Sequence, residues 1–287
     1  MRLATVRIDG ELRAARVNTD TLTVLKHAGV DEVLKAQLDW GLLAEQDGAE
    51  IAIEDADFAP VVPNPGKIVC VGLNYSEHAG EAHRELPSYP ILFAKYAEAL
   101  IGARDDILIP AVSAKVDWEA ELTIVIGRPA RYVSESQAPG HIAGYTVAND
   151  ISIRDWQRRS TQFLQGKTFE HTTPVGPYVV SADEIDVGNL RVQCTVDDEV
   201  VQDFSTAQML FSPAYLVSYL SHVITLKPGD LILTGTGSGV GVVKDPPQFI
   251  NPMSTVATEI ENIGRLENRV VPDGADASHV PGPRASK

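Results

Sequence analysis

Short runs of β-branched and aromatic residues, separated by tight turns, dominate this chain of 287 residues from about residue 107 onward. Such runs favour strands, and turns at close intervals favour a sandwich, barrel or β-roll over a doubly wound parallel sheet. One clear helix is expected at 212–221. The main strands are predicted at 121–126, 141–148, 178–181, 191–196 and 231–234. The sequence therefore predicts a mixed α+β fold that is predominantly β.

The first part of the chain has the features of a small separate unit. Asp9-Gly10 stands between two alternating runs, as in hairpins with a two-residue turn, and residues 31–38 have helical spacing. Residues 60–66 are rich in proline and predict a linker or a tight turn, whereas the polar C-terminal end carries glycine and proline. The predicted organisation is a small N-terminal α+β domain at 1–60, a main domain at 61–270 and a flexible tail at 271–287.

The acidic composition limits the partners of the chain. The formal net charge is −15, which disfavours nucleic acids and anionic membrane surfaces as ligands. No apolar run is long enough for a membrane span, and the N-terminus lacks the core of a signal peptide. Cys70 and Cys194 lie far apart and outside any C-x-x-C pair, as is typical of free thiols in a reducing compartment. We therefore expect a cytoplasmic protein.

Two glutamates, Glu119 and Glu121, stand at the head of an apolar run. Side chains alternate along a strand, so both would lie on one face, where like charges repel. A solvated sheet edge is the common explanation of such a pair, but Trp118 and the apolar run favour burial, and buried carboxylates are paired or bind a metal. Together with Asp150 they would form an all-oxygen ligand set, which suits Mg²⁺, Mn²⁺ or Ca²⁺ rather than Zn²⁺.

Other polar residues are candidates for acid–base chemistry and anion binding. His78 and Glu81 would share one helix face, where the carboxylate can orient the imidazole as a general base; an ordinary surface pair is an equal alternative. Arg154 and Lys167 are candidate anion-binding residues, with structural ion pairing as the alternative. Residues 233–241 form a glycine-rich loop that matches neither G-x-G-x-x-G nor a P-loop. We expect its amides, and Thr236, to approach a ligand.

These motifs together resemble the fumarylacetoacetate hydrolase superfamily, in its branch of acylpyruvate hydrolases and 2-hydroxyhepta-2,4-diene-1,7-dioate isomerases, over residues 67–270. The segments that carry the resemblance are Val71-Gly72-Leu73-Asn74-Tyr75, Asp117-Trp118-Glu119-Ala120-Glu121-Leu122, Asn149-Asp150-Ile151-Ser152-Ile153-Arg154-Asp155, Gly166-Lys167-Thr168-Phe169, Thr173-Pro174-Val175-Gly176-Pro177, Pro228-Gly229-Asp230, Leu233-Thr234-Gly235-Thr236 and Ile263-Gly264-Arg265-Leu266-Glu267-Asn268. The resemblance implies a β-sandwich roll as the catalytic domain, a small N-terminal domain and a homodimer.

The resemblance also implies roles for particular residues. The metal, Mg²⁺ or Mn²⁺, would be bound by Glu119, Glu121 and Asp150, and a small 2-oxo or β-diketo acid would chelate it. Residues that match the substrate pocket of relatives are Arg154, Gln157, Lys167 and Thr236. His78 and Glu81 match a water-activating dyad on a lid helix. Two positions depart from the family pattern: Gly237, where relatives often carry proline, and Glu170, where many carry aspartate.

The first functional hypothesis is metal-dependent hydrolysis of a carbon–carbon bond in an acylpyruvate such as fumarylpyruvate. It would give pyruvate and a carboxylic acid in the catabolism of aromatic compounds, with Lys167 stabilising the enolate that leaves. The alternatives use the same enolate without water: decarboxylation of oxaloacetate, or isomerisation of a 2-hydroxy-dienedioate. A metal-binding module without catalytic activity is a third possibility.

Overall fold

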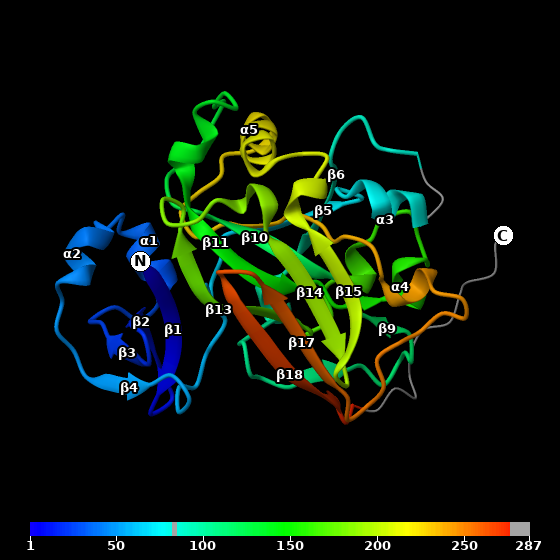
Figure 1. Ribbon diagram of the computed structural model, residues 1–287, viewed down its shortest axis with the longest axis horizontal. Coiled ribbons are helices and arrows are strands. Elements are labelled where there is room, and N and C mark those ends of the chain that lie inside the picture. Colours follow the sequence, from blue (N-terminus) through cyan, green and yellow to red (C-terminus); the bar gives the residue numbers. More distant parts are fainter. Residues whose placement is uncertain (82–84, 276–287) are drawn as a thin grey trace.

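The computed structural model describes residues 1–81 and 85–275, except for the side chains of residues 78 and 79. Two β-sheets form its centre, with short helices around them (Figure 1). The larger sheet has the strand order β4-β3-β2-β1-β13-β11-β10-β16-β5-β6, and β7 pairs with β13. The smaller sheet has the order β15-β14-β17-β18-β8. This arrangement confirms the predicted mixed α+β fold dominated by strands.

The N-terminal strands extend the larger sheet. The turn between the first two strands has Asp9 at φ 51° and Gly10 at φ 80°, as the predicted hairpin requires. The first strand then pairs antiparallel with β13, with Leu3 opposite Val179. The elements of this part are β1 (Arg2–Ile8), β2 (Glu11–Val17), β3 (Thr21–Val24), α1 (Val30–Lys35), α2 (Trp40–Ala44) and β4 (Glu50–Ala52).

The middle of the larger sheet is buried on both faces. Every residue of β10 is buried, and this strand pairs antiparallel with both β11 and β16. Strand β16 runs parallel to β5, so loops from several parts of the chain meet near the start of β10. The strands are β5 (Ile68–Gly72), β6 (Ile91–Lys95), β7 (Leu100–Ile101), β10 (Ala120–Ile126), β11 (Ile142–Asn149), β13 (Thr173–Ser181) and β16 (Leu231–Leu233).

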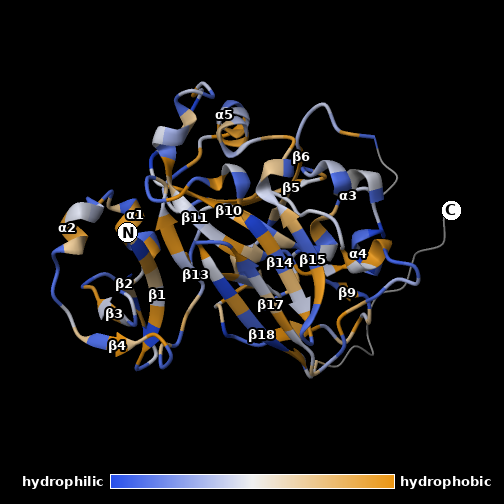
Figure 2. Ribbon diagram, viewed as in Figure 1, coloured by the Kyte–Doolittle hydropathy of each residue, from blue (hydrophilic) through white to orange (hydrophobic). Residues whose placement is uncertain are grey.

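The smaller sheet packs with β14 and β17 against β10 and β11. Residues of β18 alternate between buried and exposed, and Figure 2 shows a matching alternation of hydropathy along this sheet. Its strands are β8 (Ile107–Ile109), β14 (Arg191–Val196), β15 (Glu199–Ser205), β17 (Thr255–Ile260) and β18 (Gly264–Pro272). Val271 and Pro272 pair with β8, so these first two residues of the predicted tail belong to a strand. Residues 276–287 lie outside the described part.

The short elements frame the site. The predicted helix at 212–221 is α5 (Pro213–Val223), and the Ser212 side chain caps its N-terminus. The other short elements are β9 (Val116–Asp117), β12 (Ser152–Ile153), α3 (Ser76–Glu81), α4 (Arg154–Gln157), and the 3₁₀ turns η1 (Ala97–Ala99), η2 (Ala138–His141), η3 (Leu164–Gly166), η4 (Val187–Asn189), η5 (Thr206–Gln208) and η6 (Gly241–Val243). Within the described residues, no helix is long and apolar enough to cross a membrane.

Candidate active site

Three buried carboxylates meet at the start of β10. Glu119 precedes the strand, Glu121 lies within it, and Asp150 follows the end of β11. The pairing of Ala120 with Asn149 brings these segments together, and the amide of Asp150 donates to the carbonyl of Glu119 at 2.8 Å. One ligand atom from each carboxylate lies within 4.8 Å of the others. The structure therefore gathers the three predicted metal ligands, although Glu119 lies outside the strand.

Three cations from the described part of the chain contact this cluster. Lys167 Nζ lies 2.6 Å from Glu119 Oε2 and 2.8 Å from Asp150 Oδ2, and Lys95 Nζ lies 2.6 Å from Asp150 Oδ1. Arg154 Nη1 lies 2.7 Å from Glu119 Oε1. Burial alone would lower the pKa of Lys167, but the carboxylates of Asp150 and Glu119 outweigh it and raise that pKa above its ordinary value. Lys167 is therefore a charged ammonium.

Arg154 is fixed from a second side. Its Nε lies 2.7 Å from Asp117 Oδ2, while burial, which would lower the pKa of Arg154, is outweighed by Asp117 and Glu119. The Arg154 Nη2 atom is buried and has no hydrogen-bond partner among the described residues. A buried, unused donor beside a cavity is suited to an anionic group of a ligand.

The charges of the described cluster do not cancel. Among the described residues, the four carboxylates of Asp117, Glu119, Glu121 and Asp150 face three cations, so one negative charge is left when all are ionised, and Glu121 accepts the Gly235 amide at 2.6 Å but has no ion pair. Burial and the carboxylates of Asp150 and Glu119 hold the pKa of Glu121 well above its usual range. An excess of buried negative charge on oxygen donors fits a divalent cation such as Mg²⁺ or Mn²⁺. The triad is thus able to hold a metal.

A cavity of about 780 Å³ opens in front of the triad. Glu119 reaches it, whereas Glu121 and Asp150 are not among its lining residues. The predicted residues that line it are Glu81, Glu119, Arg154, Gln157, Lys167 and Thr236. Gln157 Oε1 accepts a hydrogen bond from Arg154 Nη1 at 3.1 Å. One cavity therefore brings together all the substrate-pocket residues predicted from the sequence, with Glu81 from the dyad.

Helix α3 docks on the glycine-rich loop beside this cavity. Glu81 Oε2 accepts the Gly239 amide at 3.0 Å, and Glu77 Oε1 accepts a hydrogen bond from Gln208 Nε2 at 2.8 Å. The helix also contains His78, whose side chain lies outside the described residues. The geometry of the His78–Glu81 dyad therefore stays a prediction.

Amides of the glycine-rich segment bind carboxylates of the protein. The expectation that the amides of residues 233–241 approach a ligand is wrong for Gly235, Gly239 and Gly241, which donate to carboxylates of the protein, as Val242 just beyond the loop also does. The pairs are Gly235 to Glu121 (2.6 Å), Gly239 to Glu81 (3.0 Å), and Gly241 and Val242 to Asp117 (2.7 and 2.9 Å). Thr236 differs: its hydroxyl donates to the Ala120 carbonyl at 2.8 Å, and it lines the cavity.

The two departures from the family pattern have different surroundings. A Cβ added at Gly237 would lie 2.3 Å from the ring of Phe204, so this ring fills the space that a larger residue at 237 would need. Phe204 in turn packs edge-to-face on Tyr75 at 5.0 Å between ring centroids. The side chain of Glu170 is exposed.

Sequence reasoning missed four residues of the site. Lys95 ends a buried strand, where a charged residue is itself a signal of a buried partner. Asp117 and Asn149 lie inside the quoted motifs but were given no role. Asn149 Oδ1 accepts the Glu119 amide at 2.9 Å. Gln202 accepts the Ala120 amide at 2.9 Å and donates to Thr236 Oγ1 at 2.9 Å. Its segment carries no motif, so no sequence signal points to it.

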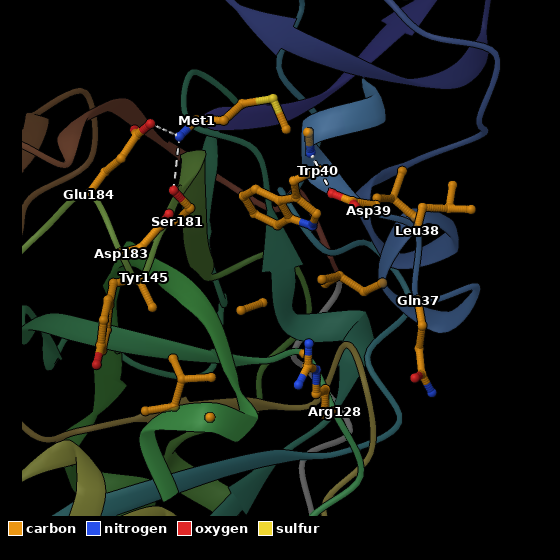
Figure 3. Close-up of a pocket in the computed structure, with 18 of the residues that line it drawn as sticks. Met1, Gln37, Leu38, Asp39, Trp40, Arg128, Tyr145, Ser181, Asp183 and Glu184 are labelled. Atoms are coloured by element: carbon orange, nitrogen blue, oxygen red, sulfur yellow. Dashed lines mark hydrogen bonds and ion pairs between the residues drawn. The ribbon is translucent and has the colours of Figure 1, made fainter. Parts of the chain in front are cut away.

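A second, larger cavity lies elsewhere. Figure 3 shows this space of about 1160 Å³, lined by Trp40 from the N-terminal helices and by Arg128, Tyr145 and Asp183 from the main part of the chain. Of the predicted catalytic, metal and substrate residues whose side chains the structure describes, none lines it. The cavity beside the triad is therefore the candidate active site.

The fold and the site define a member of an enzyme family. The family model described as fumarylacetoacetate (FAA) hydrolase C-terminal matches residues 67–271. The chain therefore belongs to the fumarylacetoacetate hydrolase family, as predicted.

Particular relatives narrow the comparison. The chain is 44% identical over 220 residues to the oxaloacetate tautomerase FAHD2A, mitochondrial, of Bos taurus, covering 76% of this chain and 70% of that protein. The crystal structure of 5-carboxymethyl-2-hydroxymuconate delta-isomerase from Mycobacterium smegmatis matches with a TM-score of 0.79 and 31% identity, over 96% of this chain and 100% of the other. The crystal structure of 2-hydroxyhepta-2,4-diene-1,7-dioate isomerase from Mycobacterium marinum matches with a TM-score of 0.78 and 32% identity, again over 96% of this chain and 100% of the other. The predicted branch and fold are thereby confirmed.

Proposed function

We propose that this chain catalyses proton transfer at the carbon next to the 2-oxo group of a small 2-oxo diacid, interconverting its keto and enol forms. The observation that carries the proposal is the buried triad of Glu119, Glu121 and Asp150 beside a cavity in which Arg154 Nη2 has an unused donor. The names of the relatives, an oxaloacetate tautomerase and two isomerases, support this reaction class.

The chain's cations bind the substrate and favour its enolate form. Arg154 Nη2 would donate to the carboxylate next to the 2-oxo group. Lys167, held charged between Glu119 and Asp150, would place a positive charge beside the oxygen that gains negative charge. A Mg²⁺ or Mn²⁺ ion held by the triad supplies Lewis-acid polarisation of the 2-oxo group when bound. These charges are fixed before the substrate binds, so little reorganisation is required.

We assign the proton transfer to residues of helix α3. Glu81 lines the cavity and is oriented by the Gly239 amide. A carboxylate at this place, with His78 on the same helix, would remove the proton from the carbon of the keto form and return it to the oxygen of the enol form, or the reverse. Gln157 and Thr236 complete the polar wall of the cavity.

Hydrolysis of an acylpyruvate is the second candidate, and the place of Glu81 favours it. The same carboxylate, acting through His78, would activate a water molecule for attack on the distal carbonyl. Decarboxylation of oxaloacetate needs the enolate stabilisation but no water. The three reactions therefore differ in what α3 does, while Arg154 and Lys167 act alike in all of them.

One panel of assays separates these reactions. Purified protein with Mg²⁺ or Mn²⁺ is mixed with enol-oxaloacetate, with fumarylpyruvate and with keto-oxaloacetate, and loss of enol absorbance, release of pyruvate and release of CO₂ are followed. We expect fast loss of enol absorbance, which a chelator and Glu119→Gln abolish. Cleavage of fumarylpyruvate without tautomerisation would replace the proposal with the hydrolase, and CO₂ release alone would replace it with the decarboxylase.

The remaining proposals concern assembly and location. We propose a homodimer, which light scattering of the purified protein tests. We also keep the cytoplasm as the proposed location, which fractionation of the source cells tests.

A further inference from the structure

The cavity beside the triad extends to an exposed rim. Its buried end is formed by Glu119, Arg154 and Lys167. The rim carries the exposed residues Arg158 and Thr161. Beside the polar Glu81, Gln157, Ser160 and Thr236, the lining includes eight apolar side chains: Val71, Leu73, Ile91, Phe93, Phe163, Val240, Val242 and Val243. A ligand that fills this cavity would therefore have polar groups at both ends and a hydrocarbon middle.

Three cations line this cavity within the described part of the chain, and they differ in their partners. Lys167 and Arg154 both pair with Glu119. The guanidinium of Arg158 makes no hydrogen bond or ion pair with any described residue. The acid that lines the cavity from α3, Glu81, accepts the Gly239 amide. Among the described cations that line this cavity, Arg158 is thus the one whose guanidinium has no carboxylate partner.

The backbone directs Arg158 to the same side as Arg154. The Arg158 amide donates to the Arg154 carbonyl at 3.1 Å, so the two residues are one helical turn apart, with Cβ atoms about 6 Å from each other. The next residue, Arg159, has another role. Its guanidinium carbon lies 3.5 Å from the ring centroid of Trp156, and it does not line the cavity. Two neighbouring exposed arginines therefore have different surroundings.

The surroundings add positive charge on this side. Arg154 and Arg158 also line a third, smaller cavity of about 130 Å³, together with Lys115. Asp155 lines it too, but its carboxylate accepts a hydrogen bond from Ser113 Oγ at 2.5 Å. The side chains of Arg158 and Lys115 therefore place positive charge at the exposed side of Arg154.

We propose that Arg158, with the hydroxyl of Thr161, forms a subsite for the distal carboxylate of the substrate and makes the enzyme select diacids over monoacids of equal chain length. This proposal rests on the proposed function, in which the reacting end of the substrate binds at Arg154 and the triad. A guanidinium–carboxylate hydrogen bond is charge-assisted, but its exposure at the rim limits its strength. We therefore expect a preference of about tenfold for the diacid.

Exchange of the proton next to the oxo group tests this subsite. The protein is incubated in D₂O with Mg²⁺ and either 2-oxoadipate or 2-oxohexanoate, and deuterium incorporation at C3 is followed by NMR. Mg²⁺ is used because, unlike Mn²⁺, it is diamagnetic. The ratio of kcat/KM for diacid over monoacid should fall about tenfold in Arg158→Gln, mainly through KM of the diacid. Arg159→Gln is the matched control and should keep the wild-type ratio. An unchanged ratio in Arg158→Gln would overturn the subsite.

A binding experiment separates the subsite from the reaction. If the wild-type protein exchanges neither acid, the proposed function fails, and calorimetry with adipate and hexanoate then decides about Arg158 alone. Adipate should bind about tenfold more tightly than hexanoate to the wild-type protein, and Arg158→Gln should remove this advantage. Equal affinities of the two acids for the wild-type protein would overturn the subsite whatever the reaction is.

Discussion

At the scale of single residues, Glu121 is the carboxylate of the site whose negative charge is least compensated by the protein. It is 1% exposed, accepts the Gly235 amide and has no ion pair among the described residues, whereas Asp150 contacts both Lys95 and Lys167. Repulsion from Asp150 and Glu119 adds to the cost of its burial. This unfavourable energy is what a divalent cation would relieve, so the stability of the protein should report on metal binding.

Glu121→Gln should have opposite effects with and without metal. Because the pKa of Glu121 is raised in the folded state, the metal-free protein should lose stability as pH rises above the ordinary value of 4.5. The variant should lack this loss and melt at a higher temperature than the metal-free wild type at pH 8. Mn²⁺ at a hundredfold excess over its Kd should stabilise the wild type by about 2.7 kcal/mol, but not the variant.

Thermal melts at several pH values, with and without Mn²⁺, measure both effects. Glu259→Gln, at an exposed position on β17, is the control and should melt and respond to Mn²⁺ like the wild type. A Glu121→Gln protein that Mn²⁺ stabilises as much as the wild type would contradict the assignment of Glu121 as a ligand.

Some of these residues could be predicted from the sequence and others could not. Glu119, Glu121 and Asp150 stand in short motifs, where charged residues next to apolar runs indicate buried partners. Gln202 binds Ala120, which is 82 positions away, through contacts that exist only once the two sheets have packed. The hydrogen bonds of an isolated glutamine are set by the tertiary structure, so no local pattern can predict them.

At the scale of elements, Asp117 connects three of them. It ends β9, accepts the amides of Gly241 and Val242 in η6, and pairs with Arg154 at the start of α4. Its side chain is fully buried. The orientation of Arg154 in the cavity therefore depends on an aspartate that does not itself line it.

Asp117→Asn should disturb the site from a distance. The amide keeps the size of the side chain but leaves Arg154 without one of its buried partners, which typically costs about 3–5 kcal/mol. We expect a lower melting temperature and a raised KM for the substrate. Asp203→Asn removes an exposed ion pair with Arg191 and serves as control, with little change expected. Equal melting temperatures of the two variants would contradict this role of Asp117.

The elements differ in how far the sequence predicts them. Strand β11 follows from a short run with β-branched and aromatic residues, and helix α5 from a capped helical period, which are local properties. The sequence predicts that the amides of residues 233–241 face a ligand, whereas Gly235 and Gly241 donate to Glu121 and Asp117. A loop's backbone conformation depends on the partners it meets, and here these partners are carboxylates from other parts of the chain.

At the scale of the whole molecule, the N-terminal part and the main part share one sheet and one core. Strand β1 pairs with β13, and Leu3 belongs to the same buried cluster as Val62, Val179 and Leu231. The sequence indicates a separate unit at 1–60 because the proline-rich segment at 60–66 interrupts its local pattern. That segment is itself partly in the core, since Val61 and Val62 are fully buried.

We therefore predict that the protein unfolds in one thermal transition. Leu3→Ala should lower the temperature of the whole transition, because a buried leucine truncated to alanine costs about 2–5 kcal/mol. Leu42→Ala, at a side chain that is 65% exposed in the same N-terminal part, is the control and should change little. Calorimetry distinguishes one transition from two. Two transitions, of which Leu3→Ala shifts only the first, would mean that the N-terminal part folds independently of the sheet that carries Glu121. With a shared core, the shift must also reach the metal-dependent stabilisation at the triad, since the unfolding that exposes Leu3 releases the metal as well.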